Sequence, residues 1–279
     1  MVLADARPAG VNRAAVLGRP VGHSLSPLLH RAAYAALGLH DWSYDALDIG
    51  ADDLPVLLAG IAPEWRGFSV TMPCKQAAVD VADLVEPLPR LLHAANTLVR
   101  TPDGWRAENT DVQGIGTALQ VAGVVDVEHA AVLGAGGTAA AAAVALASLG
   151  AAQVDVLVRD PARAGGVLRV LEVLGVTSEV QSLDGGTEAP VVVSAVPAGG
   201  QPTVAALPWR AGQTVLDVLY AGWPTPLAQA VEAAGGRAVS GLELLFWQAT
   251  AQVELMTGHP APIEAMRAAL DGRTASHPH

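Results

Sequence analysis

Short apolar segments alternate with longer alanine-rich segments along this chain of 279 residues, a pattern that is typical of strands followed by helices. In the first half, residues 14–17 and 67–71 are predicted strands. Residues 26–37 are a predicted helix, with Ser26 as its N-cap and Pro27 in its first turn. This alternation predicts βα units that pack around a parallel sheet.

Two further elements are predicted in the first half. A second helix follows Pro73 and covers about residues 75–85. Residues 96–100 and 105–109 then flank a Thr-Pro-Asp-Gly sequence, whose proline and glycine favour a tight turn. We therefore expect these two segments to pair as a β-hairpin.

The second half contains a glycine-rich turn between a predicted strand, residues 130–133, and an alanine-rich helix that runs to about Leu149. The turn has the pattern G-x-G-x-x-A and begins at Gly134. Such glycines permit a tight turn and let backbone N–H groups approach a pyrophosphate at the helix N-terminus. Further buried strands are predicted at residues 154–158, 189–196 and 214–220.

Together these elements predict an α/β protein of two domains. Residues 112–239 form a Rossmann-like dinucleotide-binding domain, because they contain the glycine-rich turn and its following strands. Residues 1–111 form an N-terminal α/β domain, which C-terminal helices from residues 240–279 complete.

The residues after the second strand of the dinucleotide domain indicate which cofactor it prefers. A 2′-phosphate favours arginine, whereas a 2′-hydroxyl favours an acidic residue at the strand end. Arg159 and Arg163 are spaced so that both can face one phosphate, while Asp160 has a separate use as an N-cap. The pattern therefore favours NADP, with NAD as a poorer alternative.

Composition draws attention to one residue. Among 16 basic residues, Lys75 is the only lysine. Arginine stays protonated in a rigid planar fork, whereas lysine is a compact ammonium that can transfer a proton. Because this chain uses arginine wherever a fixed positive charge suffices, we predict that Lys75 takes part in acid–base chemistry.

Composition and charge argue against several partners and sites. The net charge is −11 and no basic run occurs, so nucleic acid and anionic membranes are not expected partners. Neither an apolar stretch of about 18 residues nor a signal-peptide pattern is present, so a cytoplasmic protein is expected. One cysteine excludes an internal disulfide framework, and the eight histidines show no metal-ligand spacing, so no metal is expected. The tail, residues 274–279, is predicted to be disordered.

Several motifs stand in a fixed order along the chain. They are Gly-Arg-Pro-Val-Gly-His-Ser-Leu-Ser-Pro at 18–27, Ser-Val-Thr-Met-Pro-Cys-Lys at 69–75, Ala-Asn-Thr-Leu at 95–98, Glu-Asn-Thr-Asp at 108–111, and later Gly241-Leu242 and Gln248. In this order they closely resemble the motifs of shikimate dehydrogenases, over nearly the whole chain. The resemblance implies NADPH-dependent, reversible reduction of 3-dehydroshikimate to shikimate in aromatic amino acid biosynthesis, often by a homodimer.

The resemblance also implies roles for individual residues. Lys75 and Asp111 match the catalytic pair of the family. The matches to substrate contacts are Ser24, Ser26, Thr71, Asn96, Tyr220 and Gln248. The matches to cofactor contacts are Gly134, Gly136, Gly137, Thr138, Arg159, Arg163 and Gly241. Residues 1–111 and 240–279 are thereby expected to bind the substrate.

Several positions depart from the family pattern, Ser69 and Asp160 among them. The family usually has Asn where Ser69 stands, so a hydrogen bond near the site is expected to be shorter or to pass through water. Asp160 stands beside the first cofactor arginine, where an acidic group weakens the attraction for a phosphate.

Two other functions stay open at this point. A paralogue that acts on quinate or on an aminated shikimate analogue would share these motifs, although Ser26 argues against quinate, because a bulkier Thr tends to accompany quinate use in the family. A non-catalytic NADP-binding regulator of the same fold belongs to a different class. The intact pair of Lys75 and Asp111 argues against it, since a binding protein has no evident need of a proton-transferring lysine.

Overall fold

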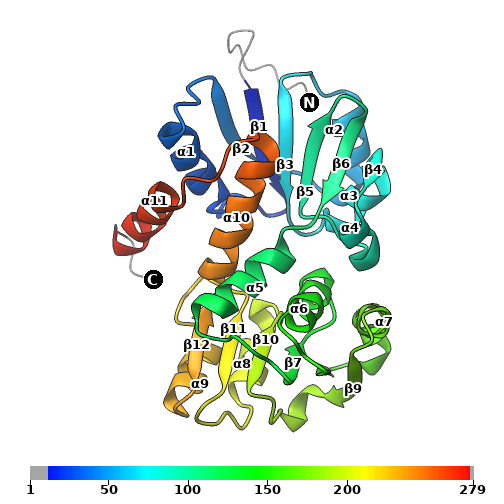
Figure 1. Ribbon diagram of the computed structural model, residues 1–279, viewed down its shortest axis with the longest axis vertical. Coiled ribbons are helices and arrows are strands. Elements are labelled where there is room, and N and C mark those ends of the chain that lie inside the picture. The colour runs from blue at the N-terminus through cyan, green and yellow to red at the C-terminus, as the bar shows by residue number, and fades with distance from the viewer. Residues whose placement is uncertain (1–11, 277–279) are drawn as a thin grey trace. The chain divides into compact units, whose positions relative to one another are not determined.

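The structure of the chain is a computed structural model that describes residues 12–276 (Figure 1). Residues 1–11, where we expect no signal peptide, and residues 277–279 of the predicted disordered tail lie outside the described part. The first three residues of that tail instead continue the last helix, α11 (Ile263–Ser276), so the prediction of disorder is wrong there.

Within the described residues the chain divides into two compact units. The first unit runs to Asn109 and resumes at Ala249, and the second is Thr110–Gln248. The later boundary falls inside helix α10 (Gly241–Thr257), whereas the sequence placed it before that helix. The domain limits 1–111 plus 240–279 and 112–239 stay a prediction.

The first unit is built on a mixed sheet that carries its own helices. The strands are β1 (Asn12–Gly18), β2 (Trp42–Asp48), β3 (Trp65–Val70), β4 (Leu84–Val85), β5 (Thr97–Thr101) and β6 (Gly104–Glu108). The helices besides α11 are α1 (Ser26–Ala36), α2 (Leu54–Ala59), α3 (Lys75–Val81), α4 (Pro87–Leu92) and the 3-10 turn η1 (Ala51–Asp53). The strand order is β2-β1-β3-β5-β6-β4, with β1 to β3 parallel and the predicted hairpin confirmed as β5 and β6.

The side chains of β3 alternate between the two faces of this sheet, as the pleat of a strand requires. Phe68 and Val70 join the apolar core that α2 and α3 complete. Gly67 faces α10, where an added Cβ would lie 2.6 Å from Met256 Cγ and 3.0 Å from Leu98 O. The absence of a side chain at Gly67 therefore lets α10 pack directly on β3.

The second unit contains a six-stranded sheet whose strands are all parallel. The strands are β7 (His129–Leu133), β8 (Gln153–Val158), β9 (Thr177–Ser182), β10 (Val191–Ser194), β11 (Thr214–Asp217) and β12 (Arg237–Ser240). The helices are α5 (Asp111–Val121), α6 (Gly137–Ser148), α7 (Gly165–Val173), α8 (Gln201–Ala205) and α9 (Pro226–Ala233), with 3-10 turns η2 (Pro161–Ala164), η3 (Leu183–Gly185) and η4 (Ala198–Gly200).

The strand order of the second sheet, β12-β11-β10-β7-β8-β9, identifies its ligand-binding edge. The chain leaves β7 toward β8 and β9, and then crosses to β10 on the other side of β7. In sheets of this type a ligand binds at the carboxyl ends of the strands where the order reverses, which here is between β7 and β10. The predicted two-domain α/β class with a Rossmann-like part is confirmed.

One predicted helix is too long. It ends at Val81 instead of about residue 85, and Leu84–Val85 form β4 alongside β6. The Asp83 carboxylate accepts a hydrogen bond of 2.7 Å from Trp105 N at the start of that strand. Pairing with the hairpin therefore outweighs the tendency of the segment to continue as a helix.

Gly67→Ala is expected to destabilise the first unit by about 1–3 kcal/mol, because the new Cβ overpacks the contact between β3 and α10. Urea unfolding, followed by circular dichroism, measures the change. The control is Gly116→Ala in α5, where an added Cβ meets nothing within 4 Å. That variant should be unchanged or slightly more stable, and equal stability of the two variants would contradict the packing argument.

Candidate active site

Backbone hydrogen bonds gather several predicted site residues at one edge of the first sheet. Thr71 directly follows β3, and its N–H donates to Leu17 O of β1 at 2.8 Å. Lys75 is the first residue of α3, and its carbonyl oxygen accepts a hydrogen bond of 2.9 Å from Ala95 N. Asn96 is the next residue, just before β5. Thr71, Lys75 and Asn96 therefore lie near the carboxyl ends of β1 and β3.

This arrangement requires glycine at the end of β1. An added Cβ on Gly18 would lie 2.8 Å from Met72 O and would also collide with the Thr71 side chain. The next residue, Arg19, donates its N–H to the same Met72 oxygen at 3.0 Å. The close approach holds the segment that carries Thr71 and Lys75 against the end of β1.

The loop that follows β1 leads into α1 through the two predicted serines. Ser26 is the first residue of α1 and not its N-cap, which is Leu25, so this part of the prediction is wrong. The backbone N–H at the start of the helix finds its partner in Ser24 instead, because Ser24 Oγ accepts a hydrogen bond of 3.3 Å from Ser26 N. Ser26 is buried, whereas Ser24 is half-buried.

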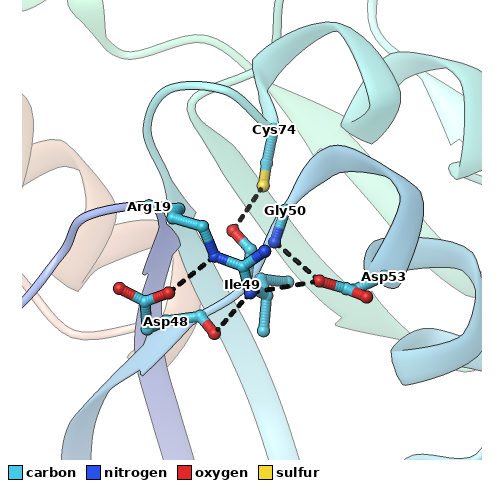
Figure 2. A network of polar contacts seen from close by, with 6 residues as sticks. All are labelled: Arg19, Asp48, Ile49, Gly50, Asp53 and Cys74. Atoms are coloured by element: carbon cyan, nitrogen blue, oxygen red, sulfur yellow. Dashed lines mark hydrogen bonds and ion pairs between the residues drawn. The ribbon is translucent and has the colours of Figure 1, made fainter.

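A network of polar contacts holds the loop after β2 beside the loop after β1 (Figure 2). Arg19 Nε donates to Asp48 Oδ1 at 2.7 Å, and Arg19 Nη2 lies 3.3 Å from Asp53 Oδ2. Cys74 Sγ donates to Ile49 O at 3.5 Å. Burial raises the pKa of the Cys74 thiol. The Arg19 pairs are about half exposed, so they orient these loops more than they stabilise the fold.

A second, buried network connects the same sheet edge to α10. The Tyr44 hydroxyl donates to Ser69 Oγ at 2.5 Å, and Ser69 Oγ donates to Gln252 Oε1 at 2.6 Å. Gln252 Nε2 donates at 3.0 Å both to Asn96 O and to Thr97 Oγ1. We call the side chains of Tyr44, Ser69, Gln252 and Thr97 the polar relay.

His30 of α1 packs against this relay. Its ring stacks on Tyr44 with 4.0 Å between the ring centroids, and its Nδ1 lies 3.4 Å from the Tyr34 hydroxyl. Burial lowers the pKa of His30 to about 3, and interaction with Gln252 only partly opposes this effect. The ring is therefore neutral at physiological pH.

Two predicted site residues lie close together in the second unit. Asp111 is the first residue of α5 and is buried. Its neighbour Thr110 donates its hydroxyl to Gln248 Oε1 at 3.5 Å. The helices α5 and α10 approach closely at Gly114, where an added Cβ would lie 3.0 Å from Gln248 Cβ. The structure therefore places Gln248 of α10 beside the first turn of α5, which begins at Asp111.

The predicted glycine-rich turn connects β7 to α6. Gly134 has φ +114°, and its N–H donates to Leu157 O at 3.0 Å. Gly136 is the N-cap of α6, and an added Cβ there would meet nothing within 4 Å. Gly137 and Thr138 form the first turn of this helix of 12 residues. The first N–H groups of α6 lack partners within the helix, as at any helix N-terminus, and the space beside Gly136 is open.

The predicted phosphate-binding residues follow β8. Arg159 comes directly after the strand and Arg163 lies in η2, and both are exposed. Asp160 is the N-cap of η2, because its Oδ1 accepts a hydrogen bond of 3.1 Å from Ala162 N. The capping role that we inferred for Asp160 is thus confirmed.

The loop after β11 carries Tyr220. It is anchored by the buried Asp217, whose carboxylate accepts hydrogen bonds from Thr225 Oγ1 at 2.7 Å and from Leu219 N at 3.2 Å. Burial raises the pKa of Asp217, and these donors oppose the effect. Gly241 meets the same loop, because an added Cβ would lie 2.8 Å from Leu219 O.

The predicted site residues are thus divided between the two units. The first unit carries Ser24, Ser26, Thr71, Lys75 and Asn96, and the second carries Asp111, Tyr220, Gln248 and the cofactor residues. Sequence reasoning singled out Ser69 but missed the other members of the polar relay. Its member Gln252 stands one helical turn after Gln248, a spacing visible in the sequence, whereas nothing local identifies Tyr44.

Among the described residues, no three His, Cys, Asp or Glu side chains are placed to hold a metal ion. Likewise, residues 12–276 contain no helix with the length and apolar character needed to cross a bilayer.

Comparison with protein families finds two matching models. Residues 16–98 match the model described as the shikimate dehydrogenase substrate binding domain. Residues 241–270 match the model described as the shikimate 5'-dehydrogenase C-terminal domain.

Individual proteins resemble the chain over nearly its whole length. A curated relative, shikimate dehydrogenase (NADP(+)) from Anaeromyxobacter dehalogenans, is 38% identical, with 92% of this chain and 95% of the relative covered. The crystal structure of Mycobacterium tuberculosis shikimate dehydrogenase is 48% identical with a TM-score of 0.84, covering 94% and 99%. Shikimate 5-dehydrogenase from Thermus thermophilus, solved with NADP(H) and shikimate, is 33% identical with a TM-score of 0.81, covering 94% and 99%.

The buried His30 is expected to make stability depend on pH. Between pH 6.5 and about 3 the unfolded chain binds a proton at this ring and the folded chain does not, so stability falls as pH falls through this window. The contribution is about 1.4 kcal/mol per pH unit.

Urea unfolding of the wild type and His30→Asn across pH 4 to 8 measures this dependence. The difference in unfolding free energy between the two proteins should change below about pH 6.5 and stay constant above about pH 7, where neither state binds the proton. A difference that is constant at every pH would contradict a neutral buried ring.

Proposed function

The chain belongs to the shikimate dehydrogenase family and is an oxidoreductase that acts on a CH–OH group; we propose that it interconverts 3-dehydroshikimate and shikimate with NADPH. The observation that carries the proposal is that Lys75, Thr71 and Asn96 lie at one edge of the first sheet, the edge from which the loop with Ser24 and Ser26 leaves β1. These side chains supply hydroxyl, amide and ammonium groups, which suit a small carboxylate with several hydroxyls.

Lys75 is the proposed acid–base group. NADPH supplies the hydride when it is bound, and the carbonyl oxygen of the substrate then gains negative charge. The Lys75 ammonium stabilises this oxyanion by its charge and donates a proton to it. In the direction of oxidation, the neutral amine of Lys75 takes the proton from the substrate hydroxyl.

The other polar residues hold and orient the substrate in this proposal. Asp111, the other member of the proposed catalytic pair, accepts a hydrogen bond from a ring hydroxyl. Ser24, Ser26 and Tyr220 donate to the substrate carboxylate, and Thr71, Asn96 and Gln248 contact the hydroxyls. A site of this kind selects strongly, because an analogue that lacks a hydroxyl leaves a buried polar group unpaired.

The second unit fits a dinucleotide at the glycine-rich turn. The left-handed Gly134 and the open space at Gly136 leave room for a pyrophosphate close to the backbone. The N–H groups of Gly137 and Thr138, at the N-terminus of α6, donate to it in our proposal. Gly241 completes the cofactor contacts.

NADP is the proposed cofactor, with NAD as a poorer alternative. Arg159 and Arg163 bind the 2′-phosphate in this proposal. The capping bond from Ala162 N supports it, because that bond commits one Asp160 oxygen to η2 and thereby lowers the repulsion of a nearby phosphate. No metal is part of the proposal.

Three further aspects of the proposal follow from the sequence and from the resemblance to the family. The substrate domain comprises residues 1–111 and 240–279, and the cofactor domain comprises residues 112–239. The protein acts as a homodimer in the cytoplasm, and it has neither nucleic acid nor membrane partners.

Purified protein with shikimate and NADP⁺ should produce NADPH, measured by its absorbance at alkaline pH, and should use quinate less well.

Lys75→Arg should fold normally yet lose about 10²–10⁴-fold in kcat, because the charge is kept and the transferable proton is not. Lys75→Ala is the comparison, since a role for charge alone predicts that Arg restores activity relative to Ala. Near-normal turnover of Lys75→Arg would show that the residue only binds.

Arg159→Ala should raise KM for NADPH by roughly 10- to 150-fold and KM for NADH much less, because one charged hydrogen bond to the 2′-phosphate is lost. Steady-state kinetics with both cofactors measures the ratio. Arg169→Ala is the matched control, because Arg169 is an exposed arginine further along on α7. Equal effects of Arg159→Ala on both cofactors would place Arg159 away from the phosphate.

A further inference from the structure

The polar relay lies in the core of the first unit and touches Asn96, one of the proposed substrate residues. Ser69 is 4% exposed, Thr97 and Tyr44 are fully buried, and Gln252 is 1% exposed. At one end Gln252 contacts the backbone of Asn96. At the other end Tyr44 stacks on the ring of His30. The burial of every member means that each polar atom must find its partner within the protein.

One backbone atom determines the direction of the hydrogen bonds. The Asn96 carbonyl oxygen can only accept, so the amide NH2 of Gln252 must face it. Gln252 Oε1 then faces Ser69, which commits its single proton to that oxygen. Tyr44 must therefore donate to Ser69.

The second branch of the relay reaches the side chain of Asn96. Gln252 Nε2 donates to Thr97 Oγ1 at 3.0 Å, and Thr97 Oγ1 donates to Asn96 Oδ1 at 2.9 Å. This bond fixes which end of the Asn96 amide is oxygen and which is nitrogen. Nδ2 points away from Thr97 and acts as a donor toward any group that it meets.

We propose that Gln252 is a positioning residue for substrate binding, acting on the Asn96 side chain through the polar relay. Its amide orients Asn96 through Thr97. The inference rests on the proposed function, because it takes Asn96 as a contact of shikimate. Gln252 itself need not touch the substrate.

A positioning role predicts a specific kinetic effect. Removing the Gln252 amide leaves the Asn96 carbonyl without this donor and releases Ser69 and Thr97 to reorient. The Asn96 side chain then adopts several orientations, and shikimate must select the productive one. The affinity for shikimate therefore decreases, whereas the affinity for NADP⁺, which binds at the glycine-rich turn of the second unit, is unchanged.

Gln252→Met keeps the volume and removes both hydrogen-bonding functions. We expect KM for shikimate to rise roughly 5- to 100-fold, the range for loss of one or two buried hydrogen bonds, while KM for NADP⁺ changes less than about twofold. Gln213→Met is the matched control. Gln213 is an equally buried glutamine in the second unit that bonds Arg210 N, Thr187 O and Ala189 O, so its replacement lowers stability without raising KM for shikimate.

Gln252→Glu distinguishes the loss of the hydrogen-bond donor from a change in packing. The carboxylate still accepts from Ser69, but it has no donor for the Asn96 carbonyl until it is protonated. Because burial raises the pKa of a carboxyl group, acid restores one donor. Relative to the wild type at each pH, KM for shikimate of this variant should therefore improve as pH falls from about 8 to 6. A pH-independent ratio would contradict the proposed role of the donor.

Tyr44→Phe removes a hydroxyl at the other end of the relay. It also tests the role of the relay if Gln252→Met does not fold. It should raise KM for shikimate, and the Tyr44→Phe, Gln252→Met double variant should lose less than the product of the two single effects. Tyr34→Phe is the control, since its hydroxyl bonds His30 and lies outside the relay.

Two results would overturn the inference while leaving the proposed function intact. One is an active wild type whose Gln252→Met and Tyr44→Phe variants keep the normal KM for shikimate. The other is an equal rise in KM for shikimate and for NADP⁺, which indicates a general loss of structure. A wild type that does not oxidise shikimate would instead overturn the proposed function, and this inference with it.

Discussion

The first candidate group depends on the close backbone approach at the end of β1. Gly18 permits it, because any side chain there would collide with Thr71 and Met72 O. Hydrogen bonds from Thr71 N to Leu17 O and from Arg19 N to Met72 O then hold the chain in this position. The start of α3, and with it Lys75, follows directly from this contact. One constraint on backbone spacing thus determines where the only lysine of the chain stands.

The polar relay adds orientation to that placement. Side chains are soft at their terminal torsions, and amide and hydroxyl groups can point either way unless their partners decide. Here the Asn96 carbonyl is an acceptor that cannot change, so it imposes one direction on the Gln252 amide and, through it, on Ser69 and Tyr44. A buried network is costly when it is incomplete. Because each member of the relay has a hydrogen-bond partner, polar side chains can be buried between β3 and α10 without this cost.

The second unit achieves its candidate site by different means. It relies on backbone groups at the turn after β7 and on exposed arginines after β8, with Asp160 used as a cap. The loop that carries Tyr220 is held by the buried carboxylate of Asp217 and by the close approach of Gly241. Rigid backbone positions the residues in both units, and buried hydrogen bonds between side chains support it in each.

Local patterns in the sequence determined the α/β class, the hairpin, the glycine-rich turn and the importance of Lys75, because each follows from a turn residue, a period or a composition that acts within a few residues. The end of α3 at Val81 and the polar relay were decided by tertiary structure. Leu84–Val85 pair with β6, and Gln252 meets Ser69 across 183 positions of the chain. Such contacts depend on how distant strands and helices pack, so no local pattern predicts them.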